Sequence, residues 1–371
     1  KMSAVKQSSD FDVVVIGAGI QGSSTAYTLS KSGKNVLLLE QFPLPHTRGS
    51  SHGQSRIIRK TYEEDHFAEM MQEAYRLWAE IEKDSNTELY VKTGMLAFGP
   101  PTDSYLKGAE RAFIKWGYPY TKFTNKEFAE AYPQINVPEN YIAILDHDAG
   151  ILRADKCLKA IQQLFVQNGG TLKDGVAVSG IRPGNTIHVS TSKGVYRCKQ
   201  LVITAGPWTS KLLKPLGLHL PLQLYAVTVC YWKHKGQALY NTSMGFPSFK
   251  ARGLENDYRS DMYGVPSEEY PNHMKVCLHS GTDIDDPEDR DLIQNGDDVA
   301  KTCDFVDKVF PGLENKPSII ERCMYTVTPD NSFVLDVHPR WNNIIIGAGF
   351  SGTGFKLGPV VGKILTDLTL K

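Results

Sequence analysis

Two short apolar runs lie near the start of the chain, at residues 11–16 (FDVVVI) and 35–40 (NVLLLE). Short runs of this kind are typical of buried strands, and the stretch between them is compatible with a helix. Strand, glycine-rich turn, helix and strand in this order predict a right-handed βαβ unit, since only that hand packs the helix back onto a twisted parallel pair. The pattern therefore predicts that the chain begins with an α/β domain.

Two later segments repeat apolar residues at helical intervals, and both predict amphipathic helices whose apolar stripe faces the core. In the first, at residues 64–83, the stripe consists of Phe67, Met70, Met71, Ala74, Leu77, Trp78 and Ile81. In the second, which Gly169 and Gly170 terminate, it consists of Leu158, Ile161, Leu164 and Phe165.

Strand patterns dominate the rest of the chain. Residues 171–204 are β-rich and broken by turn signals, which predicts a β-meander that feeds a buried strand (LVITAG). Residues 221–286 alternate Tyr, Val and Thr with polar residues, as in an antiparallel sheet that would face the substrate. Residues 343–347 (NIIIG) predict a last strand, followed by the glycine-rich AGFSGTG and a terminal helix.

Composition narrows the range of functions. The 371 residues suffice for about two domains, and 41 Lys and Arg balance 41 Asp and Glu. A neutral chain lacks the basic face that nucleic acid or an anionic membrane requires, and no apolar run reaches the roughly 20 residues of a membrane span. We expect a soluble, intracellular protein with neither partner. The six cysteines are scattered without a CxxC pair, so we expect no metal site and no disulfide framework.

The turn after the first run carries a GxGxxG motif formed by Gly17, Gly19 and Gly22, and the second run ends in Glu40. The glycines permit a tight turn and a close approach of the backbone to a pyrophosphate at the helix N-terminus. A carboxylate about twenty residues further on can accept hydrogen bonds from ribose hydroxyls and disfavours a 2′-phosphate. The motif therefore predicts a site for FAD or NAD.

Three further segments favour FAD. Residues 45–59, 323–326 (CMYT) and 349–356 (GFSGTGFK) resemble the monomeric sarcosine oxidase family of amine oxidoreductases, in the same order along the chain. The resemblance implies an α/β fold with an FAD-binding, Rossmann-like βαβ domain and an α+β second domain, in which a mostly antiparallel sheet binds the substrate. The first domain would comprise residues 10–85, 150–215 and 320–371, and the second residues 86–149 and 216–319.

The resemblance also implies how the cofactor is held. Cys323 matches a cysteine joined through its sulfur to the 8α-methyl of FAD, which would hold the flavin permanently and make it a better oxidant. Val178 matches a segment near the adenine half of the cofactor, although an ordinary core valine fits the sequence equally well. Together with the motif glycines and Glu40, the residues that we expect to bind FAD are Ser50, His52, Ser55, Val178, Cys323, Met324, Gly352 and Gly354.

For the substrate, Arg59 and Lys356 match the pair that holds a carboxylate over the flavin. Arg offers a planar fork, and Lys supplies a point charge from the far end of the chain. Arg56 matches a catalytic position stacked on the other face of the flavin ring. Thr353 departs from the family, because many relatives carry His there, and this leaves the substrate preference open.

The resemblance assigns further catalytic roles to Lys275 and His279, as an oxygen-activating lysine and an active-site histidine. Their even spacing predicts that both lie on one face of a strand. A fixed ammonium beside the ring would offset the charge that develops when oxygen is reduced. Tyr325 and Tyr263 match tyrosines of the cavity, the first as a catalytic residue and the second as a substrate-binding one.

The implied enzyme is a monomeric oxidase of small secondary α-amino acids such as L-pipecolate, sarcosine or L-proline. A hydride equivalent would pass to covalent FAD, an imine would form, and O₂ would be reduced to H₂O₂. Two alternatives stay open: an FAD-dependent dehydrogenase that passes electrons to a protein or quinone, and a dinucleotide-binding protein without turnover. The family favours the peroxisome, with an address in a tail beyond the C-terminal Leu370 and Lys371; otherwise we expect a cytoplasmic enzyme.

Overall fold

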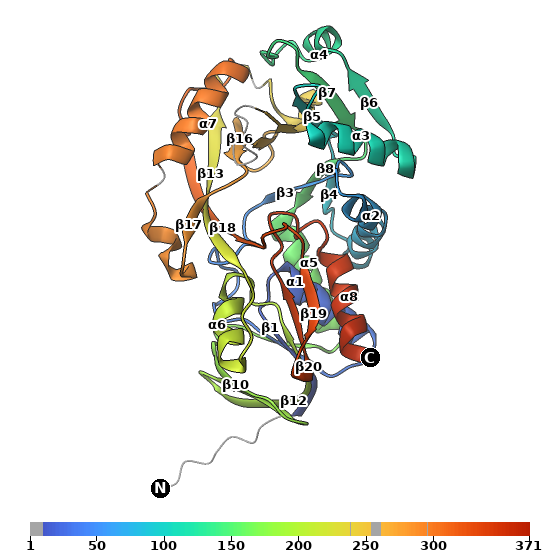
Figure 1. Cartoon of the computed structure of the whole chain (residues 1–371), viewed down its shortest axis with the longest axis vertical. Coiled ribbons are helices and arrows are strands. Elements are labelled where there is room, and N and C mark those ends of the chain that lie inside the picture. The colour runs from blue at the N-terminus through green and yellow to red at the C-terminus, as the bar shows by residue number, and fades with distance from the viewer. Residues whose placement is uncertain (1–9, 238, 254–260, 295) are drawn as a thin grey trace.

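The structure, a computed structural model, describes residues 10–237, 239–253, 261–294 and 296–371. Strands in this part of the chain form sheets of eight, nine and three strands. In Figure 1 the eight-stranded sheet occupies the lower half of the molecule, while most of the nine-stranded sheet lies in the upper half. The two large sheets therefore follow one another along the long axis of the molecule.

The predicted βαβ unit is confirmed. Strand β1 (Asp10–Ile16) pairs in parallel with β2 (Val36–Leu39), and α1 (Ile20–Lys31) connects them. Both strands are almost fully buried, which explains why they are continuous apolar runs rather than alternating ones. On the other side of β1, the parallel order continues through β12 (Gly194–Ile203) to β20 (Trp341–Ala348).

The predicted meander is confirmed as well, with one difference. Strands β10 (Val178–Arg182), β11 (Ile187–Thr191) and β12 are antiparallel neighbours, and β12 carries the buried end. Strand β9 (Thr171–Lys173) does not join them but pairs in parallel with β2. The reason is that α5 (Ala154–Gln167) packs against α1 and returns the chain to that edge of the sheet.

The helices predicted from apolar stripes cover one face of this sheet. Helix α2 (Asp65–Ser85) buries Phe67, Met71, Ala74, Trp78 and Ile81, and α5 contributes to the same core. The C-terminal helix α8 (Gly358–Leu370) packs on α1, α2 and the sheet. The remaining elements of this half are β19 (Val334–His338) and α6 (Thr209–Leu213).

The nine-stranded sheet is antiparallel, as expected for residues 221–286, except that β14 and β5 pair in parallel. Its order is β17 (Thr282–Ile284), β13 (Gln223–Lys233), β16 (His273–Leu278), β15 (Met262–Val265), β14 (Ser248–Ala251), β5 (Met95–Gly99), β7 (Ile142–Asp146) and β6 (Tyr120–Phe123), with β18 (Ile319–Val327) paired to β13. Helices α3 (Ser104–Trp116), α4 (Asn125–Ala131) and α7 (Gly296–Val309) cover it. A three-stranded sheet of β3 (Ser55–Ile58), β8 (Gly150–Arg153) and β4 (Tyr90–Lys92) lies between the large sheets.

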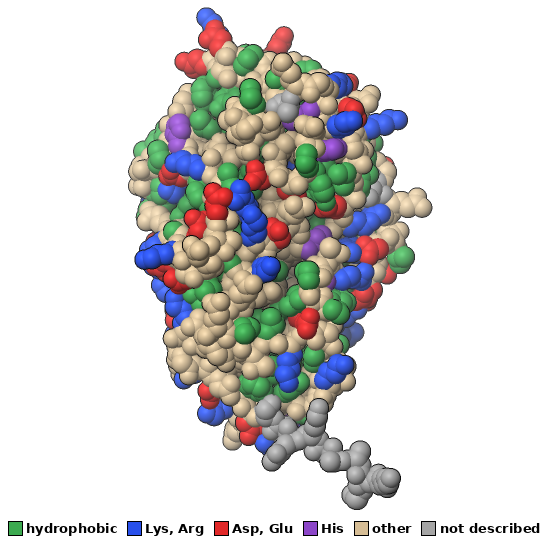
Figure 2. All heavy atoms as spheres, turned by 180° about the vertical axis from the view of Figure 1, so that it is seen from behind, with side chains coloured by type: hydrophobic (Ala, Val, Ile, Leu, Met, Phe, Trp, Pro, Cys, Tyr) green, Lys and Arg blue, Asp and Glu red, His purple; other side chains and the backbone are tan. Residues whose placement is uncertain are grey.

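The surface carries both signs of charge. On the face in Figure 2, Lys and Arg are interspersed with Asp and Glu rather than gathered into one patch. Across the described residues, no helix combines the length and apolar character needed to cross a bilayer, and none of their His, Cys, Asp and Glu side chains form a group of three that could hold a metal.

Helices α1 and α8 approach so closely that a glycine is required between them. A Cβ added at Gly362 would lie 2.7 Å from the carbonyl carbon of Ser24, so Gly362→Ala must push the helices apart. We expect the free energy of unfolding in urea to fall by about 1–3 kcal/mol. The control is Gly296→Ala at the start of α7, where an added Cβ meets no described atom within 4 Å; an equal loss in both variants would contradict the packing argument.

Candidate functional site

A cavity of about 1690 Å³ is lined by residues of both large sheets. Pockets for single small molecules measure about 300–1,000 Å³, so this one has room for a dinucleotide and a second, smaller molecule. Every site residue predicted from the sequence lines it, with the exception of Gly22. Segments from both ends and from the middle of the chain thus meet at one place.

The glycine loop and Glu40 form one end of the cavity. The backbone N–H of Ala18 donates to the Glu40 carboxylate at 3.0 Å, and that of Phe42 donates to it at 3.1 Å. The side chain of Ser51, which the sequence reasoning missed, accepts from the N–H of Ile20 in the first turn of α1 at 3.0 Å. Glu40 therefore ties the loop to the end of β2, and Glu40 itself also lines the cavity.

Gly22 is the one residue of the predicted cofactor-binding set that does not line the cavity. It lies inside α1, where an added Cβ would come 1.9 Å from the carbonyl oxygen of Gly17 and 2.6 Å from the hydroxyl of Thr204. Its position allows the helix to pack on the turn, as the third glycine of the motif does, but it is not part of the cavity wall.

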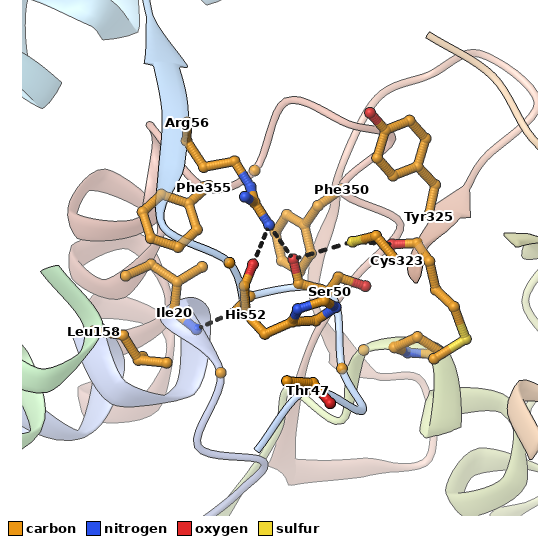
Figure 3. Close-up of a pocket in the computed structure, with 18 of the residues that line it drawn as sticks. Ile20, Thr47, Ser50, His52, Arg56, Leu158, Cys323, Tyr325, Phe350 and Phe355 are labelled. Carbon is orange, nitrogen blue, oxygen red and sulfur yellow. Dashed lines mark hydrogen bonds between the residues drawn. The ribbon is translucent and has the colours of Figure 1, made fainter. Parts of the chain in front are cut away.

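Arg56 organises the loop that follows. Its guanidinium donates to three backbone carbonyls, those of Ser55 at 2.7 Å, His52 at 2.6 Å and Ser50 at 3.0 Å, and it lies over the ring of Phe355 at 5.5 Å (Figure 3). Burial and nearby positive charge lower the pKa of His52 to about 3. Its Nε2 is buried and has no hydrogen-bond partner among the described residues.

Cys323 faces this loop from β18. Its thiol lies 3.8 Å from the carbonyl oxygen of Ser50 (Figure 3). Among the described cysteines it is the one that lines the cavity. The other five have thiol pKa values raised by burial and do not line the cavity: Cys157, Cys198, Cys230, Cys277 and Cys303.

Lys275 belongs to a buried polar network that the sequence did not reveal. Its ammonium lies 3.4 Å from the Glu269 carboxylate and donates to the Ser55 hydroxyl at 3.3 Å. Ser55 and Tyr231 also donate to Glu269, the latter at 2.6 Å. Lys275 and Glu269 have side chains only 6% and 5% exposed, so the ion pair is shielded from water. A glutamate in a loop carries no signal for such a partnership, which depends on the fold.

His279 lines the same cavity as Lys275 but does not lie on the same strand. Strand β16 ends at Leu278, where the chain turns toward β17, so the predicted strand position of His279 is wrong by one residue. Its Nδ1 lies 3.3 Å from the Tyr325 hydroxyl, and its ring contacts that of Tyr263 edge-on. Burial, followed by the positive charge of nearby lysines and arginines, holds the pKa of His279 well below 6.5, and its imidazole is therefore neutral at pH 7.

Arg59 and Lys356 meet as predicted, over one aromatic ring. The Arg59 guanidinium lies 4.0 Å from the centre of the Tyr62 ring, and the Lys356 ammonium 5.9 Å from it. Arg59 donates to the carbonyl of Thr61, and Lys356 to that of Thr353 at 3.4 Å. Burial and the neighbouring cations lower the pKa of Lys356 well below its usual value. Both cations line the cavity, and neither has a carboxylate within ion-pairing distance among the described residues.

A third lysine joins this pair although the sequence did not single it out. Lys250, on β14, lines the same cavity with a side chain 12% exposed. It alternates with the buried Phe249 and Ala251 along its strand, so the sequence pattern alone is equally compatible with a lysine that faces solvent.

The fold and cavity define a two-part dinucleotide-binding protein with a cationic small-molecule site. The chain matches the family model described as FAD dependent oxidoreductase over residues 12–368. It is 47% identical over 368 residues to the peroxisomal sarcosine oxidase of Mus musculus, covering 98% of this chain and 93% of the relative. It is 34% identical over 366 residues to a monomeric sarcosine oxidase of Bacillus sp. (strain NS-129), covering 97% and 93%.

Solved structures share the fold. NikD, an unusual amino acid oxidase essential for nikkomycin biosynthesis, superposes with a TM-score of 0.86 at 22% identity, covering 98% of this chain and 95% of that one. The chain therefore belongs to the FAD-dependent oxidoreductases and, among them, to the sarcosine oxidases, which makes it an FAD-dependent amino-acid oxidase acting on CH–NH groups. The predicted family and fold class are confirmed.

The described residues fit FAD. A Cβ at Gly17 would lie 2.5 Å from the carbonyl oxygen of Thr204, so the turn keeps a bare backbone at the cavity. The first turn of α1 carries no acidic residue, which leaves its positive end free for a pyrophosphate. The unpartnered Nε2 of His52 supplies a buried polar atom for the cofactor.

The Lys275–Glu269 pair provides a test of the network. Glu269→Gln keeps the shape of the side chain but leaves a buried ammonium without its charge partner. We expect the free energy of unfolding to fall by about 3–5 kcal/mol. In the double variant with Lys275→Met, part of that loss should return, because the unpaired charge is gone.

The matched control for this loss is Glu73→Gln, which breaks the more exposed pair with Arg76 and should cost no more than about 1 kcal/mol. If Glu269→Gln lowered the free energy of unfolding by no more than this, the buried ammonium of Lys275 would not need this carboxylate as its charge partner.

Proposed function

We propose that the enzyme oxidises small secondary α-amino acids such as L-pipecolate, sarcosine or L-proline, with covalent FAD and O₂ as the electron acceptor. The products are an imine and H₂O₂. The observation that carries the proposal is the meeting of four elements at one cavity: the dinucleotide loop, Cys323, the Arg59–Lys356 pair and Lys275. The relatives that match over nearly their full length are sarcosine oxidases, which supports the proposal.

Arg59 and Lys356 supply the carboxylate site. Both are buried and both lie over Tyr62, which fixes their side chains before substrate arrives. A carboxylate placed between them would form charge-assisted hydrogen bonds in a site that excludes most water, where such bonds are strongest. Binding the carboxylate would also relieve the repulsion between the two cations.

The same positive charge favours the uncharged form of the substrate amine. A secondary amine must be uncharged before it can give up a hydride, and cations close to an ammonium favour its neutral form. His279 is held neutral beside the Tyr325 hydroxyl, so it can hydrogen-bond there without adding a further positive charge. Tyr263 and Tyr325, both half-buried and in ring contact with His279, would limit the access of water to the reacting face.

FAD, when bound, accepts the hydride equivalent and passes two electrons to O₂. Cys323 would hold it through a thioether, and Arg56 holds the carbonyls of the loop opposite. Gly17, Gly19, Glu40, Ser50, His52, Ser55, Val178, Met324, Gly352 and Gly354 would complete the binding surface. Lys275 would place a fixed positive charge where oxygen is reduced, and Glu269 orients that ammonium.

We also propose that the chain acts as a monomer with the two-domain division given by the family, and that it works in peroxisomes, the compartment named for the mouse and human relatives.

The covalent link can be tested with Cys323→Ala. In the native protein, yellow flavin should stay with the polypeptide after acid precipitation; in the variant it should pass into the supernatant, because the sulfur is missing. Cys303→Ala, in α7 and away from the cavity, is the control and should retain the colour. Flavin released by acid from the native protein would rule out the tether.

Oxygen as acceptor can be tested with Lys275→Met. We expect the rate of reoxidation by O₂ to fall by about 10²–10³-fold, as for loss of a preorganised charge, while anaerobic flavin reduction by substrate stays within a few-fold of the native rate. Stopped-flow absorbance measures the two half-reactions separately. An unchanged reoxidation rate, or native protein that reacts with quinones but not with O₂, would favour a dehydrogenase instead.

A further inference from the structure

The cavity wall contains more positive charge than one substrate carboxylate would balance. Four cations surround His279, and each contributes to lowering its pKa: Lys250, Arg59 and Lys356, which line the cavity, and Arg252, which does not. Two aromatic rings connect all four. Tyr62 lies under Arg59 and Lys356. The Tyr105 ring lies 4.4 Å from the Lys250 ammonium, 5.0 Å from the Arg252 guanidinium and 5.7 Å from that of Arg59.

The carboxylates that neutralise this group are shared. Asp261 lies 3.6 Å from the Lys250 ammonium and also pairs with Arg252, and Arg252 lies 3.4 Å from Asp103. Two buried carboxylates thus face four cations at this end of the cavity. A third carboxylate that acts on Arg59 and Lys250, that of Glu64, is exposed, so water screens its charge. The buried group therefore retains an excess of positive charge.

The next acidic residues are already balanced. Asp146, behind Arg59, accepts from the backbone N–H of Lys60 and the hydroxyl of Thr61. Asp148 pairs with Lys60 and Lys92, so these two carboxylates match two lysines. The excess therefore faces the cavity.

Burial of such an excess is costly unless a ligand balances it. Burial, followed by repulsion from Arg59, lowers the pKa of Lys250 to about 8, in agreement with a lysine that the surrounding carboxylates do not fully compensate. A monocarboxylate between Arg59 and Lys356 would offset the charge of that pair. Lys250 would be left with a carboxylate that it shares with Arg252.

We propose that Lys250 binds a second anionic group of the substrate, so that the enzyme prefers secondary amino acids that carry two carboxylates. This deepens the proposed function and rests on it: the first carboxylate lies between Arg59 and Lys356, and the second reaches across Tyr105 to Lys250. The competing explanation is that Lys250 only completes an ion pair with Asp261, in which case it would not influence the choice of substrate.

The experiment compares acids with apolar molecules of the same shape. The pairs are N-methyl-DL-aspartate with N-methyl-DL-leucine, for a second carboxylate on the Cα side, and iminodiacetate with N-isobutylglycine, for one on the nitrogen side. For the native enzyme we expect kcat/KM to favour the acid of at least one pair by about 10- to 100-fold, which is the usual range for a hydrogen bond to a charged group.

Lys250→Met should abolish that ratio, and Lys250→Arg, which keeps the charge, should restore most of it. The control is Lys122→Met: Lys122 lies on β6 of the same sheet, pairs with Glu110 at 2.8 Å and does not line the cavity, and its replacement should leave the ratio unchanged. Native protein that prefers neither acid, or a preference that survives in Lys250→Met, would overturn the proposal.

A second measurement separates this proposal from the proposed function. Thioethers cannot form an imine, so thiodiacetate and (isobutylthio)acetate report binding alone, by calorimetric titration of the flavin-loaded protein. A preference for thiodiacetate that is lost in Lys250→Met supports the second anion site even if no amine is oxidised; turnover of sarcosine without any such preference supports the oxidase and rejects the site.

Discussion

The buried positive charge around one cavity is the constraint on which the rest of the structure depends. Arg59, Lys275 and Lys356 are each less than 10% exposed, and burial of an uncompensated charge costs several kcal/mol. Each cation therefore needs a compensating group, and its main polar partners lie within six residues of it in the chain. The fold then brings these locally compensated cations from distant segments to one cavity between the two sheets.

The cations are compensated in three different ways, and the type of compensation determines how readily each cation can bind an anion. Backbone carbonyls surround Arg56 and fix it in a loop. A carboxylate pairs with Lys275, which keeps its position while leaving the ammonium at the cavity wall. Arg59 and Lys356 have an aromatic ring and single carbonyls, which stabilise charge less completely, so these two retain the greatest capacity to bind an anion.

The sequence predicted the local parts of this arrangement well. The β1–α1–β2 unit, helices α2 and α5 and the strand before α8 follow from apolar periodicity, and Gly17, Gly19 and Glu40 follow from a motif with fixed spacing. Glu269 and Lys250 could not be predicted, because their roles depend on contacts with residues that are distant in the chain or on other strands. In the sequence alone, an acidic loop residue and a lysine in a strand look like ordinary surface residues.

The register of one strand sets the distances within the site. On β13, Val227 lies opposite Cys323 of β18, and Tyr231 lies opposite Lys275 of β16. Positions four apart on a strand share a face and are separated by about 13 Å, so the sulfur and the ammonium lie on the same side of the sheet at a fixed spacing. A slip of one residue in either pairing would turn one of them away from the cavity. The continuous ladder between β13 and β18, nine residue pairs long, opposes such a slip on the side of Cys323. On the side of Lys275, the pairing of β16 with both β13 and β15 does the same.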